Sequence, residues 1–143
     1  MDFNTINTAA DAERGADLHL VHPQLRHPLY TGPGADTHGR WSDRAKKAEP
    51  VILRVRGIDS PVARSTLKRL NAKAAKHSDD ENGLMTAISL VTDVQGVFDG
   101  KRKIEATEAD LRWLFGRSED FAVQVINFAG DRGNFFADVA ATS

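Results

Sequence analysis

The chain has 143 residues, a length that suits a single domain with a hydrophobic core of its own. Its 19 lysine and arginine residues are balanced by 20 aspartate and glutamate residues, which excludes a global electrostatic attraction to nucleic acid or to anionic membranes. The absence of cysteine excludes disulfides, zinc–thiolate centres, iron–sulfur clusters and thiol nucleophiles.

The first 16 residues are small and polar apart from Phe3 and Ile6. We expect a flexible N-terminal segment here, with at most one short helical turn. The segment shows no basic stretch followed by an apolar run, and no part of the chain approaches the roughly 20 apolar residues that span a bilayer. We therefore expect a soluble, cytosolic protein that does not bind membranes.

Two stretches have the alternation of strands with one buried face. In the first, Leu18 and Leu20 alternate with polar residues, and Pro23 ends the pattern. In the second, residues 51–57, three apolar side chains point one way and two arginines point the other; the apolar residues are Val51, Leu53 and Val55, and the arginines are Arg54 and Arg56. We expect these strands to pair as a β-hairpin or a small antiparallel sheet.

Residues 22–50 form a long loop between the two strands, and loops of this length are usually functional or disordered. The loop region contains four of the five histidines, namely His19, His22, His27 and His38. Imidazole is a common metal ligand, but no carboxylate or thiol follows at a matching spacing. The glycines of "TGPGADTHG" lack the Gly-Lys-Ser/Thr ending of a phosphate-binding loop. We expect neither a metal nor a cofactor.

Residues 58–143 are predicted to be mainly helical. One helix begins at Pro61, with Asp59 or Ser60 as its N-cap. A second begins at the capping box of Ser78 and Glu81 and is predicted to run through Val91 and Val94 to Gly96.

A turn at Asp99-Gly100 suggests a short hairpin. Thr107 and Ser118 are predicted to cap two further helices. The first should bury Leu111, Leu114 and Phe115. The chain is thus predicted to be one α+β domain, residues 1–143, in which the hairpin or small sheet precedes about four α-helices.

The helix at 61–77 carries a run of basic residues that could contact nucleic acid, namely Arg64, Lys68, Arg69 and Lys73. The alternative is an ordinary solvated helix face, which the neutral overall charge favours. Binding to nucleic acid therefore stays a second alternative rather than the first expectation.

The sequence contains no Gly-x-Ser-x-Gly nucleophile elbow, and His77 lies on the polar side of a predicted helix. The acidic residues occur where helix caps already account for them. We therefore expect a protein without catalytic activity.

Aromatic residues gather in the last third of the chain, and most of them should belong to the core. The adjacent Phe135 and Phe136 cannot both be buried easily on one side. These two residues, together with Phe128, are candidates for an exposed patch that contacts a partner.

Three stretches together resemble a known family: "ADLHLVHPQLRHPLYTG", "ILRVRGIDSPVAR" and "RWLFGRSEDFAVQVINFAGDRGNFF". This pattern is similar to that of the small tail assembly proteins, or tail assembly chaperones, of long-tailed bacteriophages. The resemblance implies a non-catalytic viral protein that acts in the host bacterial cytoplasm. It also implies binding to the tape-measure protein, recruitment of tail-tube subunits and self-association into a homo-oligomer.

Within this hypothesis the His-Pro loop shapes a protein-binding edge. Pro23 and Pro28 would stiffen an extended path, and Leu29 and Tyr30 would offer contact surface. The alternative within virion biology is a permanent structural component of the tail or neck. The alternative from another class is a small nucleic-acid-binding regulator that uses the basic helix.

Overall fold

The computed structural model describes residues 7–72 and 79–135. Its helices are α1 Thr8–Arg14, α2 Pro61–Ala72, α3 Asp79–Leu90, α4 Glu108–Arg117, α5 Glu119–Gly130 and the 3₁₀-helix η2 Arg132–Phe135. Its strands are β1 Ala16–His19, β2 Tyr30–Thr31, β3 Glu49–Pro50, β4 Ile52–Val55, β5 Val91–Gln95, β6 Phe98–Asp99 and β7 Arg102–Lys103. The predicted α+β fold is confirmed.

The largest sheet has three antiparallel strands in the order β1-β4-β5. The predicted pairing of the first two strands is confirmed, with Leu18 opposite Leu53. Leu53 and Val55 are fully buried, whereas Arg54 between them is half-buried. The alternation in the sequence therefore identified the core face of β4 correctly.

The third strand, β5, overturns the prediction of one continuous helix from Ser78 to Gly96. Helix α3 ends at Leu90, and the chain continues directly into β5. Val55 pairs with Val91 but Arg54 pairs with Asp93, so β5 carries one extra residue in a β-bulge. The bulge places two valines three positions apart, Val91 and Val94, on the same buried face, and this spacing imitates a helical stripe.

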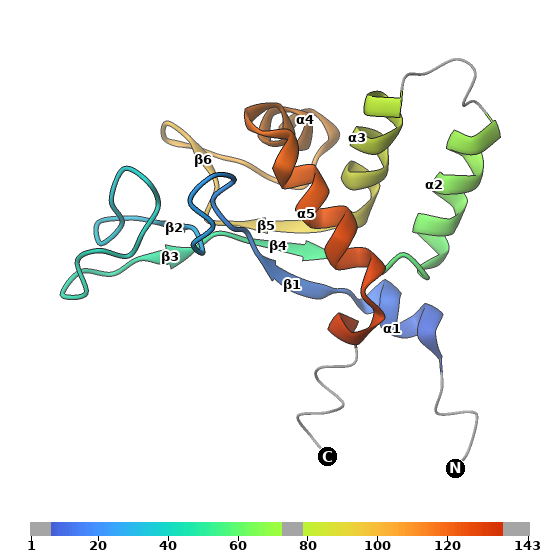
Figure 1. Cartoon of the computed structure of the whole chain (residues 1–143), viewed down its shortest axis with the longest axis horizontal. Helices are drawn as coiled ribbons and strands as arrows, with labels where there is room; N and C mark the ends of the chain where they lie inside the picture. Colours follow the sequence, from blue (N-terminus) through green and yellow to red (C-terminus); the bar gives the residue numbers. More distant parts are fainter. Residues whose placement is uncertain (1–6, 73–78, 136–143) are drawn as a thin grey trace, which may run out of the picture.

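Helices α3, α4 and α5 lie on one side of the three-stranded sheet, and α2 lies beside α3 (Figure 1). The core between these layers is formed mainly by apolar side chains. Its fully buried members include Leu20, Leu53, Leu90, Ile104, Leu111 and Val125.

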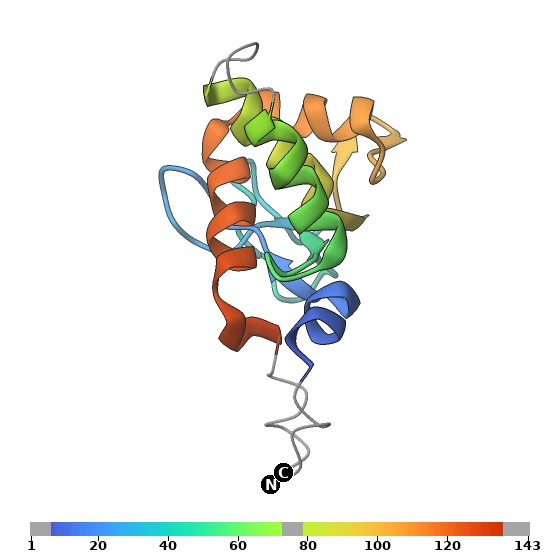
Figure 2. The same cartoon turned by 90° about the vertical axis from the view of Figure 1, so that its right-hand side faces the viewer.

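The described part of the N-terminal segment, from residue 7 onward, contains more helix than predicted. Instead of at most one turn, residues 8–14 form the seven-residue helix α1, and Asn7 accepts a hydrogen bond from Ala10 N at 2.9 Å as its N-cap. Helix α1 and η2 lie side by side at one end of the molecule (Figure 2). Gly57 lies where they meet, because a Cβ there would come within 2.7 Å of Ala12 Cβ.

The long loop also contains structure that the sequence did not indicate. Strands β2 and β3 pair within residues 22–50, and isolated bridges join Val21 to Pro28 and Ala35 to Trp41. These segments extend beyond the end of the three-stranded sheet (Figure 1).

The predicted helix starts agree with the structure wherever it describes them. Ser60 Oγ accepts from Ala63 N at 3.1 Å, and Thr107 and Ser118 cap α4 and α5. The hairpin near Asp99 is present as β6 and β7. Ser78, half of the predicted capping box, lies outside the described residues.

In the part of the chain that the structure describes, every helix is too short or too polar to cross a membrane.

Candidate functional site

A groove of about 450 Å³ opens between α3, α4 and α5. Its floor is apolar and its rim is charged. The floor consists of Leu84, Phe115, Ala122 and Ile126, and the charged rim consists of Asp80, Glu81, Arg112 and Glu119. Val123 adds an apolar residue at the edge of the groove. We call this feature the three-helix groove.

The connection between α4 and α5 shapes one wall of the groove. Ser118 alone joins the two helices in an extended conformation, with φ −159° and ψ 129°, and its hydroxyl accepts from Asp120 N at 3.3 Å. The last turn of α4 and the first turns of α5 therefore border the same hollow. A Cβ added at Gly83 or Gly116 would meet no atom within 4 Å, so space remains open at both positions.

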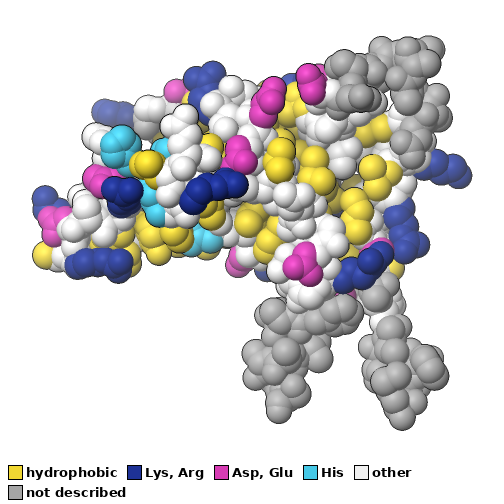
Figure 3. All heavy atoms as spheres, in the orientation of Figure 1, with side chains coloured by type: hydrophobic (Ala, Val, Ile, Leu, Met, Phe, Trp, Pro, Cys, Tyr) yellow, Lys and Arg dark blue, Asp and Glu magenta, His cyan; other side chains and the backbone are white. Residues whose placement is uncertain are grey.

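The groove also exposes apolar surface on α5. Val123 is 49% exposed, the highest value among the exposed large hydrophobic residues of the described chain. Apolar side chains gather over the region of α5 on this face, with acidic side chains above them (Figure 3). This combination of an apolar floor and an exposed apolar edge is typical of a surface that binds another molecule.

The charges on the rim do not cancel. Arg112 donates to Glu81 at 2.9 Å and to Glu108 at 3.3 Å, and these bonds raise the pKa of its guanidinium. Within the described residues neither Asp80 nor Glu119 forms an ion pair, and both are exposed. Among the residues that the structure describes, the cation of the rim is thus neutralised, while the carboxylates of Asp80 and Glu119 remain available.

The predicted contact residues of the His-Pro loop lie elsewhere and have structural partners. Tyr30 packs edge-on against His19, with ring centroids 5.0 Å apart, and tilts against Trp41 at 5.6 Å. Leu29 is half-buried against the core, and its carbonyl accepts from Val51 N at 3.0 Å. Neither residue lines the three-helix groove.

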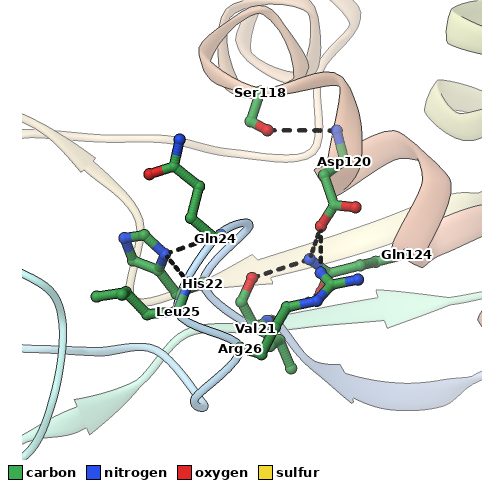
Figure 4. A network of polar contacts seen from close by, with 8 residues as sticks. All are labelled: Val21, His22, Gln24, Leu25, Arg26, Ser118, Asp120 and Gln124. Carbon is green, nitrogen blue, oxygen red and sulfur yellow. Dashed lines mark hydrogen bonds and ion pairs between the residues drawn. The ribbon is translucent and has the colours of Figure 1, made fainter.

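The first part of the loop is held on α5 by a polar network (Figure 4). Gln124 accepts from Val21 N at 2.9 Å and donates to Val21 O at 2.8 Å. Its amide also donates to Asp120, which forms an ion pair with Arg26 at 2.8 Å. The first part of the His-Pro segment is therefore fixed to a helix.

Three of the loop histidines, His22, His27 and His38, come together in the structure. The ring of His22 lies 5.3 Å from that of His27 and 6.3 Å from that of His38. His22 Nδ1 accepts from Gln24 N and Leu25 N at 3.1 and 3.0 Å. Desolvation lowers the pKa of His22, and the neighbouring His27, His38 and Arg40 lower it further.

Clustering does not by itself make a metal centre. In the described ranges, no three histidine, aspartate or glutamate side chains adopt an arrangement that could hold a metal ion. His19 lies apart and bonds to Leu29 O at 2.7 Å.

The aromatic candidates near the C-terminus are mostly structural. Phe135 is only 6% exposed and packs edge-on against Phe128, with ring centroids 5.8 Å apart. Its prediction as an exposed contact residue is wrong, because η2 folds the chain back so that the ring is buried near Gly57. Phe128 is half-buried against the core, and Phe136 lies outside the described residues.

The basic helix presents its cations to solvent. Arg64, Lys68 and Arg69 are exposed on α2, and Lys73 lies outside the described residues. Arg64 also lies 3.5 Å from Asp59, whose pKa is lowered mainly by its hydrogen bond to Arg132. Of the three described cations on this face, only Arg64 thus has a carboxylate partner among the described residues.

Sequence reasoning missed the three-helix groove. The available signal was the apolar arc of α5, which is wide for a helix that faces one core. It consists of Phe121, Ala122, Val125, Ile126, Phe128 and Ala129. Without the position of α3 and α4, the arc could not be divided into a core part and a groove part.

A comparison of the chain with protein-family models, curated proteins and solved structures finds no match in any of the three.

Proposed function

We propose that the chain is a phage tail assembly chaperone. It would bind the tape-measure protein, help to recruit tail-tube subunits, self-associate, and act without catalysis in the host bacterial cytoplasm. The proposal starts from the three stretches that resemble this family. The observation that carries it is the three-helix groove, whose apolar floor and exposed Val123 suit a protein ligand.

The composition of the groove favours binding over chemistry. Its lining combines apolar side chains with carboxylates and one arginine, and among the described residues it includes no histidine or hydroxyl side chain. Nucleophilic catalysis by a hydroxyl group, as in a Ser-His-Asp triad, needs such side chains. A groove of this kind can shelter an apolar segment of a partner until that segment is assembled.

The decisive experiment is co-expression with the tape-measure protein encoded in the same genome, followed by affinity capture and size-exclusion chromatography with mass detection. We expect a soluble complex with several copies of this chain per tape measure. Val123→Asp should weaken the complex, because it places a charge on the apolar edge. Val62→Asp is the matched control, since Val62 is an exposed valine on α2, away from the groove.

An absence of association, together with detection of the chain in purified virions, would overturn the chaperone proposal. It would point instead to a permanent component of the tail or neck.

The exposed cations of α2 favour a second candidate, a small nucleic-acid-binding regulator. Binding would then weaken steeply with salt and with replacement of Arg64 or Lys68. Electrophoretic mobility shifts at two salt concentrations distinguish this candidate from the first.

A further inference from the structure

We propose that the three-helix groove binds an amphipathic α-helix that carries lysine or arginine beside its apolar face. This inference rests on the proposed function in that it describes the tape-measure segment that the chaperone would hold.

The shape of the groove favours a helix over an extended strand. All three walls are helices, whose backbone groups are already bonded internally, so no strand edge is available for an extended peptide to pair with. Along α5 the lining runs from Glu119 to Ile126, seven positions, which corresponds to about 10 Å at the rise of an α-helix. A partner helix would therefore insert apolar residues from about two turns.

The rim determines the charge of that partner. Asp80 comes from α3 and Glu119 from α5, so carboxylates lie on two different walls. Both occupy the first turn of their helix, where the helix dipole stabilises the ionised form. Arg112 cannot offset them, because it already bonds to Glu81 and Glu108. Cationic flanks on the incoming helix complement this rim, and anionic flanks would be repelled.

A second copy of this chain fits the groove less well. Its basic helix α2 could supply cations, but the apolar side of α2 is already occupied. Ala63 and Leu70 are 1% and 4% exposed, so they pack in their own core. Helix α2 would bring charge without an apolar face, whereas the groove requires both.

The test uses the full chain and two synthetic helical peptides. Both carry the same leucine face; one has lysine on both flanks of that face and the other has glutamate. Binding is measured by fluorescence anisotropy at low and moderate salt. We expect the lysine peptide to bind about five- to thirty-fold more tightly, as two partly exposed ion pairs allow. The difference should shrink with added salt.

Variants connect the preference to the rim. The double variant Asp80→Asn, Glu119→Gln should bring the two affinities close together. The matched control Asp93→Asn, Glu105→Gln removes two exposed carboxylates outside the groove and should keep the preference. Because all four positions are exposed, the variants should fold, which circular dichroism checks.

Equal binding of the two peptides, or an unchanged preference in the rim double variant, would overturn the inference. So would self-association that Val123→Asp abolishes while neither peptide binds, because the groove would then hold a second copy. Failure to capture the tape-measure protein, with the peptide preference intact, would overturn the proposed function and leave the inference standing. If the chain captures the tape-measure protein equally well with and without the carboxylates of Asp80 and Glu119, the inference is overturned and the proposed function stands.

Discussion

Gln124 pairs with the backbone of Val21 much as a neighbouring strand would. Its side-chain amide accepts from Val21 N at 2.9 Å and donates to Val21 O at 2.8 Å, across 103 positions of sequence. Both backbone groups are partly buried and would otherwise lack a partner in the sheet. This single residue therefore holds the start of the long loop against α5.

Gln124→Leu should destabilise the protein by about 1–3 kcal/mol, because it leaves two partly buried backbone groups without hydrogen bonds while it keeps the side-chain volume. Urea unfolding followed by circular dichroism measures the loss. Gln24→Leu is the control, since its side chain is exposed in the same loop, and it should change the stability little. An equal effect of the two substitutions would show that the Gln124 contacts are not needed.

These contacts explain why the loop was hard to interpret from sequence. Residues 22–50 show little periodicity, so the sequence predicted only a loop, and the proline and tyrosine pattern suggested a recognition edge. The residues that hold it, Asp120 and Gln124, lie on a helix about a hundred positions later. No local pattern can reveal such a partner, because the contact exists only after the chain has folded.

In the three-stranded sheet, by contrast, a local sequence pattern predicted one strand correctly and missed another. The alternation of Leu53 and Val55 with arginines correctly predicted β4, because burial on one face leaves a period of two. The same rule failed at β5, where a bulge changed the period to three.

Leu53 provides the test of this core assignment. It is fully buried, so Leu53→Ala should cost about 2–5 kcal/mol through lost burial and a cavity. Ile52 is the adjacent residue on the opposite face of β4 and is only half-buried, so Ile52→Ala should cost clearly less. Denaturant unfolding of both variants measures the difference, and a larger loss at Ile52 would contradict the assigned faces.

Alanine substitutions at two glycines distinguish the cost of backbone strain from the cost of steric contact. Gly96 and Gly100 both have positive φ, at 78° and 62°. A Cβ at Gly100 would meet no atom within 4 Å, whereas one at Gly96 would come within 2.7 Å of Pro50 O. Gly100→Ala should therefore cost about 1–2 kcal/mol from strain alone. Gly96→Ala should cost more, because β5 must also move away from Pro50.

Thermal unfolding of the two glycine variants checks this order. Asn at position 100 should recover part of the loss, since asparagine tolerates the left-handed region. If both alanine variants lose the same stability, the backbone at Pro50 can move away from the added Cβ at position 96 without an energetic cost.

The three-helix groove could not be predicted from the sequence, because it depends on how neighbouring helices cover α5. The apolar arc of α5 was visible, and Val125 and Ala129 are buried as that arc required. The groove arises because the single residue Ser118 turns α5 back against α4, while α3 arrives from the other side. A helical pattern shows which side is apolar, but not how much of that side its neighbours cover.

The histidine cluster leads to a prediction about pH. His22 accepts two backbone hydrogen bonds through Nδ1, a role open only to the neutral ring, and its pKa is lowered from the ordinary value of 6.5. Desolvation is the main cause, with His27, His38 and Arg40 adding repulsion. Because the unfolded chain binds the proton more readily, the stabilisation is complete above about pH 6.5 and is lost as the pH falls from there through the folded pKa.

His22→Asn isolates this effect. The asparagine oxygen can accept from Gln24 N and Leu25 N as in an Asx-turn, but it does not titrate. We expect the variant to match the wild type near pH 7.5 and to lose less stability between pH 7 and pH 5, measured by urea unfolding across that range. An NMR titration of the His22 ring in the wild type should give a midpoint below 6.5. A midpoint above that value, or the same pH dependence in both proteins, would mean that the folded protein does not favour the neutral ring of His22.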